Sequence, residues 1–348
     1  MKSPSQLLIE KAEAGRALSR VEAEAFMEEL LSGRISTPKI VRMLLAVNQR
    51  AVSVDELTGF ARVMRKHAAP VFAADEPRPT ELVDTCGTGG DETGTFNIST
   101  ASAIVAAAAG ARVAKHGNRS VSSRSGSADV LEALGVRIDL PMTVAGRSVR
   151  EIGIGFLFAP AAHAAARHAA PARQQIGKRT IFNLLGPLTN PAGAEAQVLG
   201  VFSADVIDTV AATLAELGTH RAFVVHGAGG LDEISLSGET QIAEVRNGSV
   251  RRFTVAPEDF GVSRAPLEAI HGGTPQDNAK LIHSLLAGEP GPRLDIVIAN
   301  AAAALLVTGA AEDFRTSAEL ARRAVTSGKA REKLDQLKTF SQKHAPAK

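Results

Sequence analysis

The sequence contains no tryptophan and no tyrosine, and only one of its 348 residues is a cysteine, Cys86. Aromatic stacking therefore has to come from its 13 phenylalanines or not at all. A single thiol excludes a disulfide within the chain and fits a reducing compartment. An excess of charge is lacking too, since 39 basic and 37 acidic residues leave a net charge of +2. Net charge thus gives no reason to expect a polyanionic partner such as nucleic acid.

Long apolar runs are also lacking. The most apolar stretches, Ala101–Ala111 and Ile296–Gly309, are well short of the roughly 20 residues that span a bilayer. The N-terminal stretch carries Glu10, Lys11 and Glu13 where a signal peptide needs its apolar core. We therefore expect a cytoplasmic protein with no membrane and no nucleic-acid partner.

What is present is the composition of a soluble globular protein, with 45% hydrophobic and 22% charged residues. The first 70 residues predict a set of helices. Ser19–Glu22 and Ser53–Glu56 have the capping-box spacing, and Thr37–Pro38 places a capping hydroxyl before a proline at the first helical position. The proline-punctuated stretch Ala69–Glu81 then indicates a linker.

From Leu82 onward, short apolar runs alternate with helical segments. Strand candidates are Leu82–Val83, Ala111–Gly117, Ile154–Pro160 and Arg221–Gly227, and helices are expected over Ser99–Ala109, Ala128–Gly135, Ala161–Gln175 and, broken at Gly328, Thr316–Ser341. Strands that alternate with helices favour an α/β layer with a largely parallel sheet. The predicted fold class is therefore α/β, with an all-helical N-terminal segment.

A glycine-rich loop lies between the first strand candidate and the helix that follows, in Asp84–Thr100 (DTCGTGGDETGTFNIST). Glycine lets the backbone approach a ligand and point its N–H groups at it, and the first N–H groups of a helix lack internal partners. This arrangement is typical of a phosphate site at Asn97–Thr100; a capped helix after a flexible turn is the alternative. Neither the dinucleotide nor the P-loop motif fits, because Glu92, Thr95 and Phe96 occupy positions that those motifs reserve for other residues.

A second loop, Lys115–Gly135, is basic and rich in serine, and we expect Ser127 to cap the helix that it enters. Lysine and arginine supply charge, while hydroxyls and backbone N–H groups supply geometry. Because both loops follow strand candidates, they would meet at the carboxyl edge of a parallel sheet, where ligands bind. A solvated loop is the alternative for this segment taken alone.

Two further segments carry candidate side chains. Asp232 and Glu233 are adjacent acids after a glycine-rich turn, which suits Mg²⁺ bridging to phosphate oxygens, although solvated surface acids remain the alternative. Arg173 stands with Lys178 and Arg179 near a helical segment. An arginine there holds a carboxylate through two N–H groups, or else covers a helix end or a domain seam.

Taken together, these segments resemble the anthranilate phosphoribosyltransferase family. GTGGD, NIST, KHGNRSVSS, FLFAP, RTIFNLLGPLTNPA and LDE occur in that order, and the resemblance covers nearly the whole chain. It implies a pentosyltransferase that moves the phosphoribosyl group of phosphoribosyl diphosphate (PRPP) to the amine of anthranilate and releases pyrophosphate. This reaction is the second step of tryptophan biosynthesis from chorismate. The resemblance further implies Mg²⁺, as two ions bound with PRPP, and a homodimer.

The resemblance also implies two domains, in a fold shared with pyrimidine nucleoside phosphorylases. Residues 1–70 with about 165–185 would form a small helical domain that carries the dimer interface. Residues from about 71–164 with 186–348 would form a large α/β domain, whose central, largely parallel sheet is flanked by helices and holds the PRPP and Mg²⁺ sites.

Site residues carry over position by position. The PRPP-binding residues would be Gly87, Gly90, Asp91, Thr95, Asn97, Ile98, Ser99, Thr100, Lys115, His116, Gly117, Asn118, Arg119, Ser120, Val121, Ser122, Ser123 and Ser127. The anthranilate-binding residues would be Gly87, Asn118, His163 and Arg173, and the metal ligands Ser99, Asp232 and Glu233. One departure from the family is Ala164–Ala166, where proline and methionine are frequent; it would widen the anthranilate channel or soften its packing.

The implied chemistry needs no covalent nucleophile, and Cys86 is expected to be a small buried filler. The aryl amine is a weak nucleophile, so positioning matters most, and Mg²⁺ stabilises the charge that develops on the leaving pyrophosphate. Two other functions stay open. A pyrimidine nucleoside phosphorylase would have no need for the acid pair together with Arg173, and a non-catalytic nucleic-acid-binding relative would need a basic groove.

Overall fold

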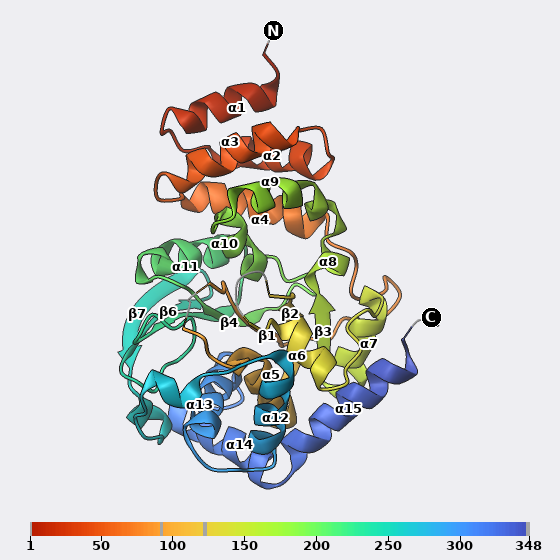
Figure 1. The fold of residues 1–348 in the computed structure, drawn as a ribbon, viewed down its shortest axis with the longest axis vertical. Coiled ribbons are helices and arrows are strands. Elements are labelled where there is room, and N and C mark those ends of the chain that lie inside the picture. The colour runs from red at the N-terminus through yellow and green to blue at the C-terminus, as the bar shows by residue number, and fades with distance from the viewer. Residues whose placement is uncertain (1, 91–92, 121–123, 346–348) are drawn as a thin grey trace.

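The computed structural model describes residues 2–90, 93–120 and 124–345 (Figure 1). Its N-terminal part is helical, as predicted, and contains α1 (Pro4–Glu13), α2 (Arg20–Leu31), α3 (Thr37–Asn48) and α4 (Val54–Lys66). Both predicted capping boxes are present, at the starts of α2 and α4. The cap predicted for α3 is wrong by one residue, because Ser36 is the N-cap and Thr37 is already helical.

A seven-stranded sheet forms the centre of the rest of the chain (Figure 1). Its strands are β1 (Leu82–Gly87), β2 (Arg112–Gly117), β3 (Ile154–Phe158), β4 (Ala196–Gly200), β5 (Arg221–Gly227), β6 (Thr240–Arg246) and β7 (Ser249–Val255). They lie in the order β3-β2-β1-β4-β5-β6-β7, with parallel pairing from β3 to β5 and antiparallel pairing beyond. The prediction of an α/β fold with a largely parallel sheet is confirmed.

Helices cover both faces of this sheet. One face packs against α5 (Ile98–Ala108), α6 (Ser127–Ala133), α12 (Pro275–Leu286), α13 (Pro292–Val307), α14 (Phe314–Thr326) and α15 (Lys329–Lys343). The other face packs against α7 (Met142–Ile152), α10 (Ile181–Leu188) and α11 (Ile207–Glu216). Successive strand residues alternate between the faces. In β1, the side chain of Val83 packs among the helices of the first face and that of Leu82 among those of the second.

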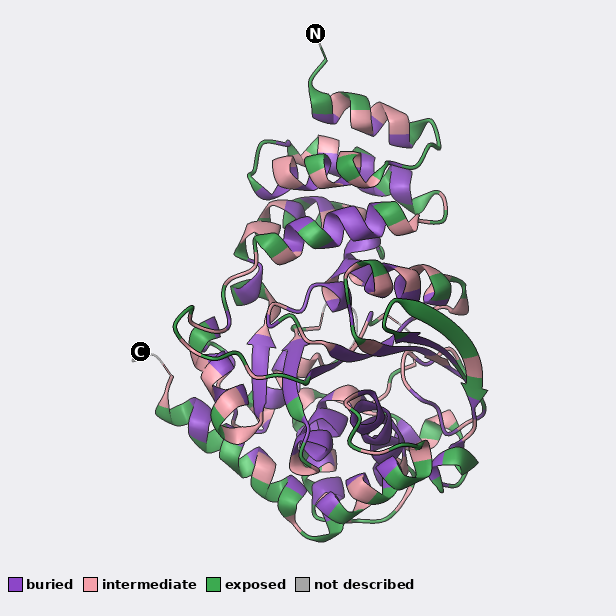
Figure 2. Ribbon diagram, turned by 180° about the vertical axis from the view of Figure 1, so that it is seen from behind, coloured by how far each residue is buried: buried purple, intermediate pink, exposed green. Residues whose placement is uncertain are grey.

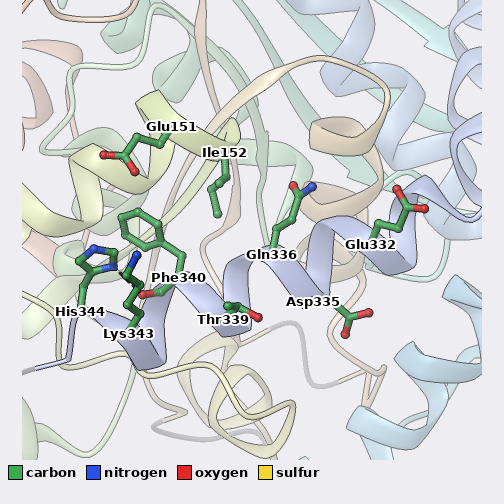
Figure 3. Close-up of a pocket in the computed structure, with 9 residues that line it drawn as sticks. All are labelled: Glu151, Ile152, Glu332, Asp335, Gln336, Thr339, Phe340, Lys343 and His344. Carbon is green, nitrogen blue, oxygen red and sulfur yellow. Dashed lines mark hydrogen bonds between the residues drawn. The ribbon is translucent and has the colours of Figure 1, made fainter.

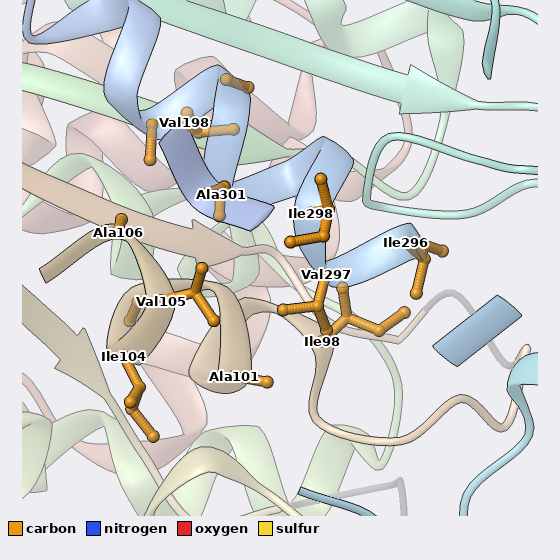
Figure 4. Packing of buried hydrophobic residues seen from close by; sticks show 14 of the residues in the cluster. Ile98, Ala101, Ile104, Val105, Ala106, Val198, Ile296, Val297, Ile298 and Ala301 are labelled. Carbon is orange, nitrogen blue, oxygen red and sulfur yellow. The ribbon is translucent and has the colours of Figure 1, made fainter. Parts of the chain in front are cut away.

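Helices α5 and α13 are buried along almost their whole length, with Ala101 of α5 and Ala301 of α13 in the same apolar core (Figure 4). A helix that is apolar all round belongs in a core, and alanine lets helices approach closely. This packing places the first turn of α5 at the sheet edge. Strand β7 contrasts with it, since most of its residues are exposed (Figure 2).

After β3 the chain leaves the sheet and reaches the N-terminal helices. It forms α8 (Ala159–Ala162), a 3-10 helix (Ala164–Ala169) and α9 (Ala170–Ile176). The 3-10 helix packs against α2, and α9 packs against α3 (Figure 1). The chain then returns to the sheet through α10. The division into two domains stays a prediction. It assigns about residues 165–185 to the small helical domain, and the contacts of the 3-10 helix with α2 and of α9 with α3 are compatible with that assignment.

Three features differ from the sequence-based expectations. Ser127 is not the cap of α6: the N-cap is Gly126, and Ser127 is the first helical residue. Strand β4 was not predicted. Nor was the hairpin of β6 and β7, although its turn, Asn247–Gly248, has φ values of 49° and 81° and is a strong hairpin signal.

The side chain of Glu56 ties the N-terminal helices together. It is fully buried, and it accepts hydrogen bonds from the backbone N–H groups of Leu18 and Ser53, each at 3.1 Å, and from the guanidinium of Arg50. Burial raises the pKa of Glu56, but the bonds from Arg50, Ser53 and Leu18 outweigh burial and hold it below its ordinary value. The carboxylate of Glu56 is therefore charged in the native state at neutral pH.

We expect Glu56→Ala to lower the free energy of unfolding by about 3–5 kcal/mol, because it leaves the Arg50 charge without its partner. Since the folded pKa lies below the unfolded one, the contribution of Glu56 is present above the unfolded pKa and is lost as pH falls through the folded pKa. Urea denaturation of both proteins at neutral and acidic pH measures the difference, which should shrink in acid.

Glu13→Ala is the matched control for this experiment. Glu13 also pairs with an arginine, Arg42 at 2.7 Å, but its side chain is 37% exposed. Exposed pairs contribute little, so a much smaller loss is expected. Equal losses in the two variants would show that the buried network around Glu56 contributes no more to the free energy of unfolding than an exposed ion pair.

Candidate functional site

Among the parallel strands β1 to β5, four end in glycine, and an acidic turn lies directly across the ends of three of them, β1, β4 and β5. A Cβ atom on Gly87 of β1 would stand 2.4 Å from Oδ2 of Asp232, and one on Gly200 of β4 would stand 1.5 Å from the Asp232 carbonyl oxygen. A Cβ atom on Gly227 of β5 would stand 2.4 Å from the Glu233 carbonyl oxygen. Real Cβ atoms do not approach so closely, so the turn can occupy this place only because the strands end in glycine.

The acidic turn contacts both of the other predicted phosphate elements. Oδ2 of Asp232 accepts a hydrogen bond from the N–H of Gly89 at 2.9 Å, and Oε1 of Glu233 accepts one from the N–H of Ser99 at 3.1 Å. The residue after Glu233, Ile234, is held by the side-chain amide of Asn300 in α13. Asn300 Oδ1 accepts from the N–H of Ile234 at 2.9 Å, and its Nδ2 donates to the carbonyl of Ile234 at 3.0 Å. The structure thus joins the glycine-rich loop, the start of α5 and the acid pair at one edge of the sheet.

Lys115, at the end of β2, places a positive charge beside this junction. Its Nζ donates to the carbonyl oxygen of Thr85 and, at 3.3 Å, to Oγ of Ser99. Burial lowers the pKa of Lys115, and the carboxylates of Asp84 and Glu233 act in the opposite direction. An ammonium group near the first turn of a helix reinforces the positive end of that helix.

Asn97 connects the glycine-rich loop to the second loop. Its Nδ2 donates to the carbonyl of Ser125 at 3.0 Å, and its Oδ1 accepts from the side chains of Ser125 at 3.0 Å and Asn278 at 2.9 Å. Thr95 forms an isolated antiparallel bridge with His271. The N-cap residue of α5 is thereby joined to Ser125 in the second loop and to Asn278 in α12.

Ile98 and Thr100, both predicted to bind PRPP, are each 1% exposed within α5. Their side chains face the core, so only their backbone groups could reach a ligand at the sheet edge. The hydroxyl of Thr100 has no hydrogen-bond partner among the described residues.

The second loop is shaped around Ser127. Its Oγ accepts from the N–H of Asn118 at 3.2 Å and donates to the Asn118 carbonyl at 3.2 Å. A Cβ atom on Gly117 would stand 2.3 Å from the same Oγ. Ser127 thus fixes the backbone where β2 ends, which is a loop-shaping role that a helix cap would not have.

Arg119 is turned toward α6. Its guanidinium pairs with Asp129 at 3.0 Å and with Glu132, and the N–H of Ser120 donates to Asp129 at 2.9 Å. The charge of Arg119 is therefore already neutralised, and this pairing favours a backbone role for it. Four predicted PRPP-binding residues, Asp91, Val121, Ser122 and Ser123, lie outside the described residues.

Two buried histidine rings lie behind the loops. The His116 and His163 ring centroids are 5.2 Å apart, in an edge-to-face arrangement. His163 Nε2 donates to the carbonyl of Thr189 at 2.9 Å. The backbone N–H of His116 donates to Oδ1 of Asp84 at 3.1 Å. Burial lowers the pKa of His116 to about 3 and also lowers that of His163. Both rings are neutral near pH 7 and so offer an uncharged, ring-lined surface.

Arg173 is a half-buried cation in α9. Its guanidinium lies 5.3 Å from the centroid of the Phe182 ring, and burial lowers its pKa. No carboxylate in the described part of the chain pairs with it. A partly dry arginine without a partner acid is suited to an anionic ligand.

Sequence reasoning did not assign several residues of this edge. Arg179 was noted as basic, but its Nη1 donates to the Gly90 carbonyl at 2.8 Å, which the sequence did not predict. Thr88 is held twice, through its N–H to the Gly200 carbonyl at 2.9 Å and through its hydroxyl by the N–H of Phe202 at 3.1 Å. These contacts join residues about a hundred positions apart, so no local pattern points to them.

A hollow of about 550 Å³ lies elsewhere, between α7 and α15 (Figure 3). Glu151, Asp335 and Phe340 are among its lining residues, and none of the predicted motifs reaches it. Within residues 2–90, 93–120 and 124–345, no group of three or more histidine, cysteine, aspartate or glutamate side chains gathers as a metal site.

Comparisons with known proteins give the family of the chain. A family model described as the a/b domain of a glycosyl transferase family matches residues 79–331, and one described as the helical bundle domain matches residues 6–68. An anthranilate phosphoribosyltransferase from Pelotomaculum thermopropionicum is 51% identical over 333 residues, or 96% of this chain and 95% of that protein. The chain belongs to the anthranilate phosphoribosyltransferase family. The family predicted from the ordered motifs is confirmed.

Solved structures of anthranilate phosphoribosyltransferases share the whole fold. That from Thermus thermophilus is 44% identical and has a TM-score of 0.89, covering 96% of this chain and 99% of that one. That from Saccharomyces cerevisiae in complex with 4-fluoroanthranilate is 25% identical and has a TM-score of 0.86, covering 98% and 99%. The likeness to the anthranilate phosphoribosyltransferase structures extends over the N-terminal helices as well as the sheet.

Proposed function

We propose that the chain transfers the phosphoribosyl group of PRPP to the amine of anthranilate, giving N-(5-phosphoribosyl)anthranilate and pyrophosphate. This is the second step of tryptophan biosynthesis from chorismate. The observation that carries the proposal is the junction at the sheet edge, where Asp232 bonds Gly89 and Glu233 bonds Ser99. It brings a backbone phosphate cradle and a pair of acids together in a chain about half of whose residues match enzymes named for this activity.

PRPP would lie along the two loops. The backbone N–H groups near Gly87 and Gly90, the first turn of α5 and the Lys115 ammonium group would hold its phosphates. Ser127 and Asn97 would act by fixing the loop backbone, since both already bond loop groups. The assignments that fall on residues 91 and 121–123 remain predictions.

Mg²⁺ fits the donors at this edge. Asp232, Glu233 and Ser99 offer carboxylate and hydroxyl oxygens, the ligands that Mg²⁺ prefers, and phosphate oxygens would complete its coordination. We propose two ions bound together with PRPP. Bound there, Mg²⁺ would neutralise the charge that develops on the leaving pyrophosphate.

The chain's own groups would bind and orient the aromatic substrate. Arg173 would hold the anthranilate carboxylate, and the neutral rings of His116 and His163 would lie beside the aryl group without contributing charge. Burial raises the pKa of Cys86 well above its ordinary value, although Gln197 donates to its Sγ at 3.2 Å and acts in the opposite direction. The thiol is therefore neutral near pH 7 and is unsuited to act as a nucleophile. Direct attack by a positioned amine is the remaining route.

We also propose a homodimer formed through the N-terminal helices. Of the four large hydrophobic side chains exposed among the described residues, three lie on α1, α2 and α3: Leu7 at 54%, Val21 at 73% and Leu45 at 44%. Association of two chains through these helices would remove the three side chains from water. Sedimentation velocity would show a dimer, and a monomer at micromolar concentration would contradict the proposal.

A cytoplasmic location is proposed as well. It fits the single cysteine of the sequence. Among the described residues, none of the helices combines the length and the apolar character needed to cross a membrane.

Turnover of anthranilate with PRPP and Mg²⁺ tests the proposed activity, through the release of pyrophosphate. The two alternatives predict other results: a pyrimidine nucleoside phosphorylase would cleave uridine or thymidine with inorganic phosphate, and a nucleic-acid-binding relative would retain DNA in a salt-dependent way. We expect neither result. Phosphorolysis of a nucleoside without any anthranilate turnover would overturn the assignment.

Gly90→Val is expected to weaken PRPP binding by about 10-fold while anthranilate binding changes little. Gly90 has a φ of +74°, which costs a β-branched residue about 1–2 kcal/mol, and a Cβ atom there would stand 3.3 Å from Cδ of Arg179. The loop would have to move away from its ligand. Calorimetry with PRPP and anthranilate, each titrated alone, measures the two affinities.

Gly248→Val is the control for backbone strain alone. Gly248 has a φ of +81°, nothing lies within 4 Å of a Cβ atom there, and it belongs to the distant β6–β7 turn. It should lose stability and keep PRPP affinity. If Gly90→Val also kept wild-type PRPP affinity, the loop would be structural.

A further inference from the structure

Arg179 lies between the N-terminal helices and the glycine-rich loop. It belongs to the segment that joins α9 to α10, and its side chain extends to the loop, where Nη1 donates to the Gly90 carbonyl at 2.8 Å. Its guanidinium lies over the ring of Phe202, 4.5 Å from the ring centroid. Stacking and a directed hydrogen bond together fix the plane of the guanidinium, which a single contact would not do.

Phe202 also holds the start of the same loop. Its N–H donates to Oγ1 of Thr88 at 3.1 Å, and the N–H of Thr88 donates to the Gly200 carbonyl at 2.9 Å. The chain just after β4 therefore supports the loop in two ways: its backbone anchors Thr88, and its aromatic ring supports the arginine that bonds Gly90.

The other end of this chain of contacts is in helix α3. Asn48, the last residue of α3, donates from Nδ2 to the backbone carbonyl of Arg179 at 2.8 Å. A shift of α3 relative to the sheet would move the backbone of Arg179, and with it the group that holds Gly90. Arg173 lies six positions earlier, in the preceding helix α9, so one short stretch of chain reaches both proposed substrate sites.

We propose that Arg179 is a positioning residue for PRPP, which makes the shape of the glycine-rich loop depend on the position of helix α3. It acts through the Gly90 carbonyl and does not touch the substrate. This inference rests on the proposed function, because the loop is a PRPP site only if the chain uses PRPP. Movement of the N-terminal helices, including movement caused by a ligand at Arg173, would thereby change PRPP affinity.

Steady-state kinetics with each substrate varied in turn tests the proposal. Arg179→Ala should raise the PRPP KM about 5- to 10-fold, the loss of one hydrogen bond with a charged donor, and change the anthranilate KM less than about twofold. Asn48→Ala should raise the PRPP KM about two- to threefold although Asn48 does not contact the loop. In the double variant, Asn48→Ala should add nothing further, because its effect passes through Arg179.

Arg179→Lys separates positioning from direct charge. Lysine keeps the positive charge but lacks the planar group that stacks on Phe202 while donating to Gly90. It should recover less than half of the loss in free energy. Full recovery by lysine would mean that the charge itself attracts PRPP, and additive effects of Asn48→Ala and Arg179→Ala would mean that no relay exists; either result overturns the proposal.

Arg251→Ala is the matched control. Arg251 also stacks on a phenylalanine, Phe253 at 5.2 Å, and also makes a polar contact, an ion pair with Glu244 at 2.9 Å, but on the exposed edge strand β7. Neither KM should change in this variant.

Hydrogen exchange of the Gly89 amide gives a readout that does not depend on activity. This amide is bonded to Asp232 and should exchange several times faster in Arg179→Ala than in the wild type, without any ligand. Unchanged exchange would refute the positioning role. Absence of turnover in the wild type would instead refute the proposed function and leave the exchange result to decide this inference separately.

Discussion

Replacing Asp232 by Asn together with Glu233 by Gln should lower kcat/KM for PRPP by about two to three orders of magnitude, the size of effect seen when one preorganised electrostatic group is removed from an active site. The amides keep the shape of the side chains but lose both charges, so affinity for Mg²⁺ should fall. The defect should lessen as Mg²⁺ is raised.

The fold should survive this exchange. An amide oxygen can still accept the bonds from the N–H groups of Gly89 and Ser99, and the turn is held independently by Asn300 and by the glycines beneath it. Circular dichroism and thermal unfolding check this. Normal activity at limiting Mg²⁺ would remove the acid pair from the metal site.

Asp75→Asn with Glu76→Gln is the matched control for the loss of two neighbouring charges. These acids are also adjacent, and Glu76 also has a partner, Arg150 at 2.6 Å, but they lie in the linker before β1. This variant should keep kcat/KM within about twofold, as expected for surface acids.

Arg173→Ala should raise the anthranilate KM by about 10- to 150-fold, corresponding to about 1.5–3 kcal/mol for a hydrogen bond to a charged group. Burial lowers the pKa of this arginine, so its charge is poorly solvated, and no acid of the described chain compensates it. An anionic substrate would supply that partner. If the contact also orients the amine, kcat will fall too.

Kinetics with each substrate varied, and calorimetry with PRPP alone, separate the possibilities. PRPP affinity should be nearly unchanged, and Arg173→Lys should restore only part of the anthranilate affinity, because lysine lacks the two-pronged donor. A loss shared equally by both substrates would indicate that Arg173 only supports the packing around Phe182.

The parts of the fold that the sequence predicted are those with a local cause. Capping boxes at Ser19 and Ser53 rest on residues three apart, and the alternation of strands and helices follows from hydrophobic periodicity. The β6–β7 hairpin also has a local cause, because Asn247–Gly248 is a turn dipeptide that the sequence shows directly. Strand β4 is a five-residue buried run, too short to be told from a buried helical segment by periodicity.

The site divides in the same way. The glycine-rich loop, the basic loop and the acid pair are each short local patterns, and the structure joins the acid pair to the loop and to α5. The need for glycine at Gly200 and Gly227 comes from a turn that crosses distant strands, which no spacing reveals. Arg119 is paired with α6 for a similar reason, since the geometry of that helix decides which acids it meets.

The glycines beneath the acidic turn have a consequence for engineering this scaffold. A Cβ atom at Gly200 would stand 1.5 Å from a backbone atom. Rotation about the side-chain bonds does not move a Cβ atom, so every residue other than glycine would clash there. A mutational scan should show Gly200 as intolerant as the proposed metal ligands, although it has no functional group. Libraries intended to broaden the range of accepted amines should therefore vary residues of the proposed anthranilate channel, such as Ala164–Ala166, and leave the strand ends unchanged.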